Sequence, residues 1–485
     1  MQAFGPVLYF RGVEGDAWRL SALVGIPEGE EPALLSADDA EPVSPTFLAR
    51  RRGLKLWRYD FTFVVTDEPA VHRYAIGERS FTVHLPAASA ADLRLAFTAC
   101  NGQEAGNVWP TSRERNANWL DLAEVHRERP FHLLLQGGDQ LYADAIWEEV
   151  PVLKRWQGER WPRRRDEPFT DEMARATADA YFDSYCWLWA QPELAPLLAE
   201  IPSLMMWDDH DIFDGWGSYG PEWQESAVFQ GVWSAAREAF CLFQLAIEPS
   251  CGTNESGHGA QHFGWSHIVG DVGILAPDLR SQRSRTRILS DEQRRDLTAA
   301  LERMGGCRQI FLISTVPLVN VRLGLLERFF DWFPGHQTWQ DDLIDQWPSV
   351  HHRREWADLL RELTDFSART GARIVTLSGE IHLGAFGRIS RGDTRIVQLT
   401  ASGIVHPPPD AFGVRGLEWA SRGVQRLKPD ISVTFLPMPG TDRLYLRERN
   451  WLEIDRSRDA VQATWHSEAP NGGRHTFETD VWSDT

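Results

Sequence analysis

The chain has 485 residues, of which 42% are hydrophobic, so it can bury a large core and exceeds the usual length of one domain. Its formal net charge of −19 argues against tight non-specific binding to nucleic acid, because phosphate backbones attract clustered Lys and Arg. The five cysteines form no C-x-x-C pair, which argues against a structural zinc site and indicates a reducing compartment. No export signal or long apolar run is visible, so we expect a cytoplasmic protein without a membrane span.

The N-terminal part of the chain has the pattern of a small β-domain. Short β-like runs at residues 6–10, 56–65 and 80–85 are separated by turn-rich acidic stretches. We therefore expect a β-sandwich-like domain over residues 1–85, joined to the rest by a linker over residues 86–92.

From residue 93 onward, short apolar strands alternate with helices, which is typical of an α/β layer architecture. One helix is expected to begin at Ser290, which can form a capping box with Gln293. The expected strands cover residues 93–98, 131–136, 204–207, 272–276, 309–313, 374–377 and 396–400.

A long helical insertion is expected over residues 147–198, with one helix over residues 171–190. Its basic run, residues 163–165, and the tryptophans near Trp223 are open to two interpretations: a lid over a cleft, or a solvated face and core packing. Residues 443–485 return to strand-like alternation and are expected to form a β extension on the main sheet.

Polar residues follow four of the predicted strands directly, where open α/β sheets place their sites. Each cluster has an ordinary alternative: a buried Cys, an Asp that caps a helix, solvated acids or a surface Glu with a satisfied His. A chance coincidence of four is much less common, so together they indicate a metal centre. The four clusters contain Cys100; Asp139 and Tyr142; Asp208, Asp209 and His210; and Glu380 and His382.

These clusters carry a resemblance to a known family. The segments GDQLY (138–142), WDDHD (207–211) and SGEIH (378–382) resemble the Gly-Asp-x-x-Tyr, Trp-Asp-Asp-His-Glu and Ser-Gly-Asp-x-His motifs of the PhoD-like branch of the calcineurin-like metallophosphoesterases. Residues 278–283 are a weaker echo of its Asp-Thr-Arg-x-Tyr-Arg motif. The resemblance implies a metallophosphatase-type αββα sandwich over residues 93–442, beside the N-terminal β-sandwich domain.

The resemblance also implies a dinuclear metal site. Cys100, Asp139, Tyr142 and His382 would bind one metal, and Asp139 would bridge to a second. Glu380 departs from the family's Asp, and Asp211 stands where the family has Glu. A thiolate and a phenolate suit Fe³⁺, whereas carboxylates suit Ca²⁺, Mg²⁺ or Mn²⁺. The candidate ligands of the second metal are Asp208, Asp209 and Glu380.

The implied activity is hydrolysis of phosphate mono- or diesters by metal-bound hydroxide, of the alkaline phosphatase or phosphodiesterase type. His210 would protonate the leaving oxygen or stabilise its developing charge. Arg280 and Arg283 would hold phosphoryl oxygens, with a solvated basic stretch as the alternative for both arginines.

Two other functional hypotheses stay open. One is a catalytically idle scaffold whose N-terminal domain binds a partner or a carbohydrate. The other is a cysteine hydrolase in which Cys100 acts with His210 and an Asp, either Asp208 or Asp209. The second hypothesis leaves Tyr142 and the Glu380-to-His382 segment without a role.

Overall fold

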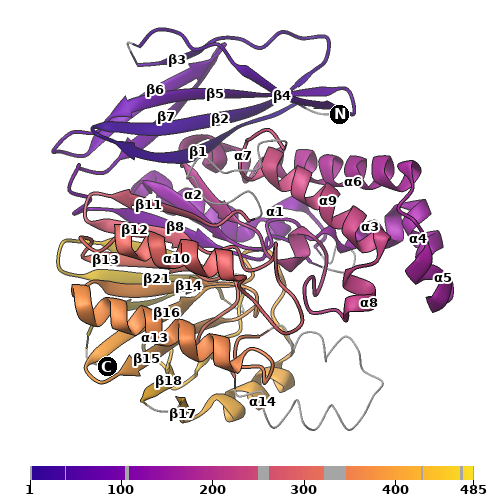
Figure 1. The fold of residues 1–485 in the computed structure, drawn as a ribbon. Helices are drawn as coiled ribbons and strands as arrows, with labels where there is room; N and C mark the ends of the chain where they lie inside the picture. Colours follow the sequence, from indigo (N-terminus) through magenta and orange to yellow (C-terminus); the bar gives the residue numbers. More distant parts are fainter. Residues whose placement is uncertain are drawn as a thin grey trace.

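The computed structural model describes residues 3–38, 40–103, 109–249, 262–321, 346–427, 430–469 and 473–483 (Figure 1). Within these residues the strands gather into two large sheets and a small one. The small sheet contains β3 (Leu35–Ala37), β6 (Ala70–Ile76) and β7 (Arg79–Leu85). The fold is mixed α/β.

The first large sheet has ten described strands, in the order β22-β21-β20-β8-β9-β10-β1-β2-β5-β4. Its central strands β8, β9 and β10 are parallel and buried along their whole length, as their continuous apolar sequences require. The bounds are β22 (Arg474–Asp480), β21 (Val461–Glu468), β20 (Asn450–Arg456), β8 (Arg94–Thr98), β9 (Leu133–Gly137), β10 (Ser203–Met206), β1 (Phe4–Glu14), β2 (Ala17–Pro27), β5 (Leu54–Val64) and β4 (Thr46–Arg51).

Segments from both ends of the chain extend this sheet. The N-terminal β1 lies parallel to β10, with Tyr9 opposite Ser203, and β2, β5 and β4 continue outward from it. At the other side, β20 pairs antiparallel with β8, and β21 and β22 follow. The strands of the core are therefore completed by residues far away in the sequence.

The second large sheet runs in the order β11-β12-β13-β14-β16-β15-β18-β17, with β19 beside β15. Strands β12, β13, β14 and β16 are parallel to one another. The described bounds are β11 (Trp265–Val269), β12 (Val272–Ala276), β13 (Gln309–Ile313), β14 (Arg373–Ser378), β16 (Thr394–Thr400), β15 (Gly384–Arg391), β18 (Ile431–Leu436), β17 (Val424–Leu427) and β19 (Tyr445–Leu446).

The second sheet is buried on both faces, and β13 shows how. Phe311 and Ile313 belong to a core shared with Phe97 of β8, whereas Ile310 and Leu312 face a second core built with helical residues. Helices α10 (Asp291–Arg303) and α13 (Arg353–Thr370) lie along this sheet (Figure 1). The two large sheets therefore share one core, and helices cover the second sheet.

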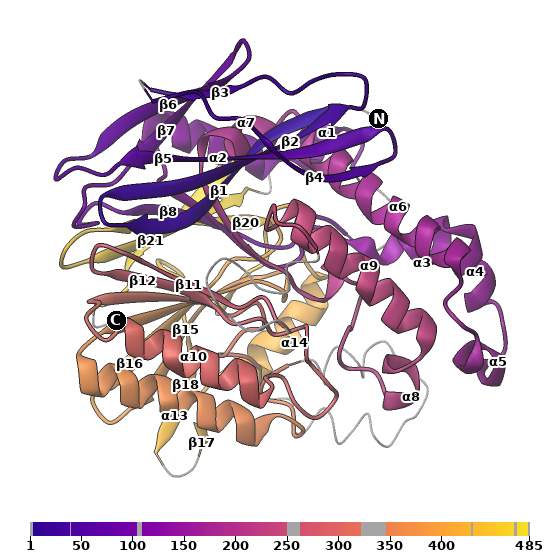
Figure 2. The same cartoon turned by 45° about the horizontal axis from the view of Figure 1, so that its top comes forward.

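A group of helices projects from one side of the sheets (Figure 2). This helical arm consists of α3 (Ile146–Glu149), α4 (Pro151–Gln157), α5 (Trp161–Asp166), α6 (Asp171–Trp189), α8 (Pro221–Gln224) and α9 (Ala227–Phe243). The other described helices are α1 (Ser112–Arg115), α2 (Ala117–Glu128), α7 (Ala195–Glu200) and α14 (Ala411–Ser421), with short 3₁₀ turns η1 (Ala143–Ala145) and η2 (Asp209–Asp211). No described helix combines the length and the apolar composition that crossing a membrane requires.

The helix-end signals of the sequence are confirmed where they can be checked. Ser290 Oγ accepts a hydrogen bond from the backbone N–H of Gln293 (3.1 Å), and Gln293 Oε1 accepts one from the N–H of Ser290 (2.7 Å), which is the predicted capping box. The predicted helix over residues 171–190 is α6, which begins after the N-cap residue Thr170.

Candidate metal centre

The carboxyl ends of the central strands of both sheets meet at one place. Cys100 follows β8, Asp139 follows β9 and Glu380 follows β14. Two hydroxyl groups link the sheets there: Ser402 Oγ lies 3.1 Å from Cys100 Sγ, and Thr315 Oγ1 donates to an oxygen of Asp208 at 2.8 Å. The polar clusters that the sequence separates by almost 300 residues therefore share one site.

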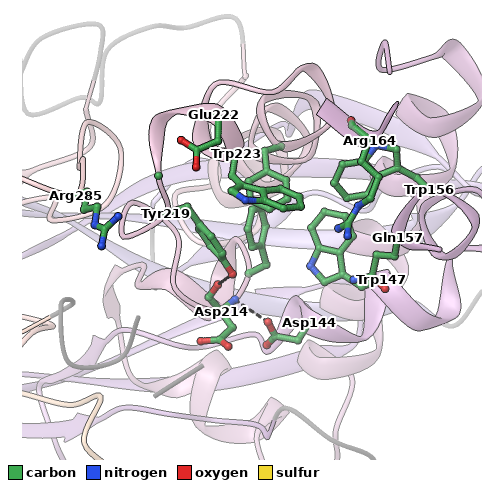
Figure 3. A pocket seen from close by; sticks show the side chains of 13 residues that line it. Asp144, Trp147, Trp156, Gln157, Arg164, Asp214, Tyr219, Glu222, Trp223 and Arg285 are labelled. Carbon is green, nitrogen blue, oxygen red and sulfur yellow. Dashed lines mark hydrogen bonds between the residues drawn. The ribbon is translucent and has the colours of Figure 1, made fainter. Parts of the chain in front are cut away.

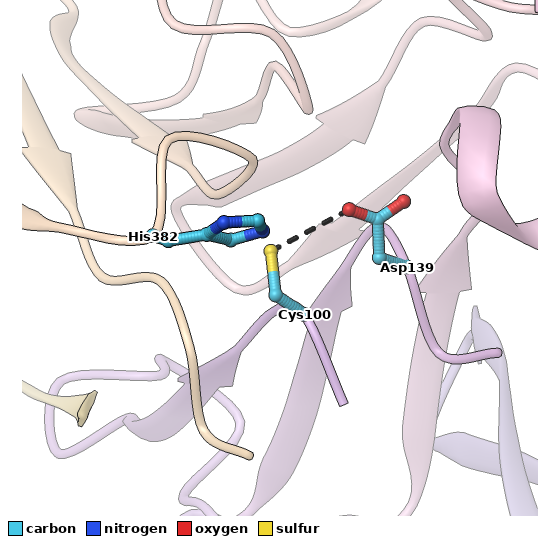
Figure 4. Close-up of side chains that lie close together, drawn as sticks. All are labelled: Cys100, Asp139 and His382. Carbon is cyan, nitrogen blue, oxygen red and sulfur yellow. Dashed lines mark hydrogen bonds between the residues drawn. The ribbon is translucent and has the colours of Figure 1, made fainter. Parts of the chain in front are cut away.

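One cluster consists of Cys100, Asp139 and His382, whose potential ligand atoms all lie within 4.8 Å of one another (Figure 4). The Cys100 thiol donates to Asp139 Oδ2 at 3.5 Å. Tyr142 joins this cluster because its hydroxyl lies 2.9 Å from His382 Nε2. Four predicted ligands are thus brought together.

A second cluster consists of Asp139, Asp209 and His210, again within 4.8 Å. Asp139 belongs to both clusters, so its carboxylate lies between them. Nδ1 of His210 lies 2.7 Å from Asp144 Oδ2, and the His210 ring stacks on the Tyr142 ring with centroids 4.2 Å apart. The two clusters therefore form one continuous centre.

Four candidate ligands have left-handed backbone conformations. The φ angles are 57° at Cys100, 56° at Asp139, 64° at Glu380 and 53° at His382. A side chain held in this region costs on the order of 1–3 kcal/mol, and such positions concentrate at functional sites. Backbone hydrogen bonds tie the first two loops together, since the N–H of Cys100 donates to Gly138 at 3.1 Å.

Gly138 is needed for the close approach of these loops. Its φ is 107°, and a Cβ at this position would lie 2.8 Å from the Cβ of Asp208. The glycine before Asp139 therefore lets the turns after β9 and β10 pack against each other.

The electrostatics of the centre disfavour ionised ligands in the absence of a cation. Burial, with the nearby Asp139 charge, raises the pKa of Cys100 well above its usual value. Burial also raises the pKa of Asp139 well above its usual value; His210 opposes this rise, and Asp208 and Asp209 add to it. A bound cation would reverse the balance by favouring the thiolate and the carboxylates.

A second observation, besides the electrostatics, indicates that these residues suit a metal ion. Asp139 Oδ1 is buried and accepts no hydrogen bond from any described residue. Buried carboxylate oxygens normally have a partner, and cations are the partners that carboxylate, thiolate, phenolate and imidazole groups share. The residues present therefore suit metal binding.

Arg280 lies among the carboxylates. Its side chain is 0% exposed; Nε donates to Asp208 Oδ1, and Nη2 lies 3.2 Å from Asp209 Oδ1. The same nitrogen is 4.0 Å from Glu380 Oε1, which also accepts a hydrogen bond from Gln346 at 2.7 Å. Arg280 therefore neutralises and orients acids that the sequence assigned to the second metal.

Arg283 is buried as well. A Cβ on Gly217 would lie 2.6 Å from Arg283 Cγ, so the 217 loop passes directly against this side chain.

Asp144 holds the imidazole of His210. Its Oδ1 accepts the backbone N–H of Asp214 at 2.7 Å, which fixes the carboxylate while Oδ2 contacts His210. Burial opposes protonation of His210, but Asp144 and Asp209 outweigh it, so the pKa of His210 is raised well above its usual value. The imidazole is thus disposed to carry a proton.

Asp211, which the sequence analysis placed in the WDDHD motif without giving it a role, is a structural residue of the centre. One oxygen accepts hydrogen bonds from the backbone N–H groups of Asp139 (2.9 Å) and Asp208 (3.0 Å). The other accepts them from the backbone N–H of Leu141 (2.9 Å) and the side-chain Nε2 of Gln244 (2.8 Å). Burial raises its pKa to about 7. It joins the turns after β9 and β10, and its place in the run of acids beside His210 was the available signal.

Three further residues of the centre were missed. Ser402 and Thr315 follow β16 and β13, so the strand-end rule that found Cys100 would have found them. His406 stacks on His382 with ring centroids 3.4 Å apart, but no motif surrounds it. Its position beside His382 is evident only from the folded structure.

Comparisons with known proteins identify a family and a similar fold. Residues 61–334 match a protein family described as PhoD related phosphatase. An uncharacterized protein of Saccharomyces cerevisiae, YGR266W, is 25% identical, over 79% of this chain and 68% of its own length. The solved structure of PhoD has the same fold, with a TM-score of 0.61 and 13% identity over 99% of this chain and 92% of that one.

Proposed function

This chain belongs to the family of PhoD related phosphatases, and on that premise we propose that it hydrolyses phosphate mono- or diesters at a centre of two metal ions. The observation that carries the proposal is the position of Asp139, whose carboxylate belongs to both clusters of potential ligands. A carboxylate shared in this way is suited to bridging two cations. The activity would be of the alkaline phosphatase or phosphodiesterase type.

We assign one metal to Cys100, Asp139, Tyr142 and His382, and propose Fe³⁺ because of the thiolate and phenolate. The second, proposed as Ca²⁺ or else Mg²⁺ or Mn²⁺, would use Asp139 and a set of acids that consists of Asp208, Asp209 and Glu380. When bound, such a pair neutralises phosphoryl charge and lowers the pKa of the attacking water. The raised pKa of the buried Cys100 thiol disfavours the thiolate that a cysteine nucleophile needs, whereas a bound cation would itself favour thiolate formation.

His210 is proposed to protonate the leaving oxygen. One of its ring nitrogens lies within 4.8 Å of the Asp139 and Asp209 carboxylates, and Asp144 holds Nδ1. With Nδ1 directed at Asp144, the transferable proton is the one on Nε2. Asp144 is therefore a positioning residue that orients the imidazole and stabilises its charged form.

Arg280 is proposed to orient Asp208 and Asp209, since its buried guanidinium contacts both. The expectation that Arg280 and Arg283 hold phosphoryl oxygens stays a prediction.

The proposed domain organisation follows the family. We take residues 93–442 as a metallophosphatase-type αββα sandwich, with residues 147–198 as a helical insertion and residues 443–485 as a β extension. Residues 1–85 would be a β-sandwich-like domain that also continues the first large sheet through the pairing of β1 with β10, and residues 86–92 would be the linker that follows it. The core shared by the two sheets and the helices over the second sheet support this proposal.

The test combines metal analysis with activity. Protein reconstituted with iron plus calcium, magnesium or manganese is assayed on p-nitrophenyl phosphate and bis-p-nitrophenyl phosphate. Asp139→Asn should lose metal and activity together, because its carboxylate serves both clusters. His210→Ala should retain metal and lose turnover, whereas the exposed control His475→Ala should keep both. Failure of every reconstituted sample to hydrolyse either ester would overturn the proposal.

A further inference from the structure

A cavity of about 520 Å³ opens within the helical arm, beside the metal centre (Figure 3). This volume lies within the range of roughly 300–1,000 Å³ that is typical of small-molecule sites. Six of its thirteen lining residues are aromatic, and most of the others are acidic or basic. The aromatic residues that line it are Trp147, Trp156, Phe213, Tyr219, Trp223 and Phe229.

The aromatic walls are held in place by their own packing. The Trp223 ring lies 3.8 Å from that of Trp161, and Trp147 stacks on Trp156 with centroids 5.7 Å apart. The Arg164 guanidinium lies 4.5 Å from the Trp156 ring and 4.7 Å from the Trp223 ring. Rings fixed in this way present flat surfaces without a further loss of side-chain entropy on binding.

The cavity is connected to the proposed acid of the reaction. Asp144 forms part of its lining and also contacts His210 Nδ1 at 2.7 Å. Figure 3 shows Asp144 and Asp214 on one side of the cavity and Trp223 on the other. A group departing from phosphorus toward His210 would therefore leave in the direction of these aromatic rings.

We propose that this cavity binds the leaving group of the substrate, and that this leaving group carries a planar aromatic ring system. The inference rests on the proposed phosphoesterase function and adds its substrate class. Flat rings stack favourably on the wall formed by Trp147, Tyr219 and Trp223. Asp144 and Asp214 disfavour an anionic group next to them, so the part of the ring system that faces these two acids is neutral or carries hydrogen-bond donors.

The test compares two esters of primary alcohols, 2-naphthylmethyl phosphate and n-butyl phosphate, which differ mainly in the ring. The wild type should show a kcat/KM for the naphthylmethyl ester that is larger by on the order of tenfold. Trp223→Ala should remove most of this preference and change the butyl rate less than about twofold. The matched control Trp187→Ala, whose side chain is 52% exposed on α6, should keep the preference.

A binding measurement separates this inference from the proposed function. Calorimetric titration with the product alcohol, 2-naphthylmethanol, should show binding to the wild type and its loss in Trp223→Ala. Binding without hydrolysis of either ester would support the cavity and contradict the phosphoesterase proposal. Equal kcat/KM values for both esters, affected equally by Trp223→Ala, would overturn the inference and leave the phosphoesterase intact. If Trp223→Ala lowers the melting temperature, Trp147→Leu replaces it in both measurements.

Discussion

At the scale of single residues, Asp211 shows how much of the centre depends on side chains that bind no substrate. Its carboxylate accepts hydrogen bonds from the turns after β9 and β10, which carry Asp139 and Asp208. In Asp211→Asn, an amide group would replace one accepting oxygen and leave two buried N–H groups without a partner. We expect a loss of about 2–4 kcal/mol in the free energy of unfolding, measured by urea denaturation.

The exposed control for this variant is Asp166→Asn, on α5, which should change stability by less than about 0.5 kcal/mol. Equal stability of the two variants would show that the turns do not need Asp211.

A second prediction at this scale concerns Asp144. If it positions His210 as an acid, Asp144→Asn should lower kcat for n-butyl phosphate by about 100-fold, because an alkoxide needs a proton to depart. The rate for p-nitrophenyl phosphate should fall by less than about threefold, because that leaving group departs without one. The exposed control is Glu148→Gln on α3, and equal losses on both esters would contradict the assignment.

At this scale the sequence identified several polar residues that lie shortly after a buried strand, although it missed Ser402 and Thr315. Cys100, Asp139 and His382 were found in this way, and the structure brings them together. Asp144 and His406 were not found, because they lie several residues beyond their strands and contact the centre only through the packing of the loops. Their contacts depend on tertiary structure that no local pattern records.

At the scale of elements, two neutral histidines fix the connection between α2 and β9. His126 Nδ1 accepts the N–H of Phe131 at 3.0 Å, and His132 Nδ1 accepts the N–H of Arg94 at 2.9 Å. Burial, assisted by nearby positive groups, lowers their pKa values to about 4 and about 3. Because the unfolded chain binds these protons near pH 6.5, their contribution is complete above that pH and is lost as the pH falls toward the folded values.

We therefore expect the contribution of each histidine to the free energy of unfolding to fall by about 1 kcal/mol between pH 7 and pH 5.5, measured by urea denaturation at both values. His126→Asn and His132→Asn keep an acceptor for the backbone N–H and should each remove that part of the pH dependence. An unchanged pH dependence in both variants, compared with His475→Asn as the exposed control, would show that these histidines do not titrate on unfolding.

The positions of the helices and strands were largely predictable from the sequence, whereas the order of the strands in the sheets was less predictable. The strands predicted at residues 272–276 and 309–313 have those bounds in β12 and β13, because apolar runs bounded by polar residues specify buried strands. It was harder to predict which strands are neighbours in the sheet, since β1 pairs with β10 although almost 200 residues separate them in the sequence. Such pairing depends on the burial of whole faces and leaves no local signal.

At the scale of the whole molecule, the candidate metal centre lies where the two large sheets meet. The loops after β8 and β9 face those after β14 and β16, and several candidate ligands have strained backbones. Ions that bind only the folded state raise its stability, and the gain grows with the logarithm of the ratio of free ion concentration to dissociation constant. We expect removal of metal with a chelator to lower the melting temperature by several degrees and addition of metal to restore it.

Asp139→Asn supplies the control for the chelation experiment, because its melting temperature should respond weakly to both treatments. A melting temperature of the wild type that is independent of chelator and metal would contradict a metal-dependent link between the sheets.

The pairing of β8 with β20 has a consequence for how the protein is made. Arg94 of β8 forms an ion pair with Glu453 of β20, 359 positions later in the chain. During vectorial synthesis, the strand that precedes Cys100 therefore gains this neighbour only after a long further stretch of chain has left the ribosome. Metal would then be acquired after translation of β20 rather than by the emerging N-terminal half.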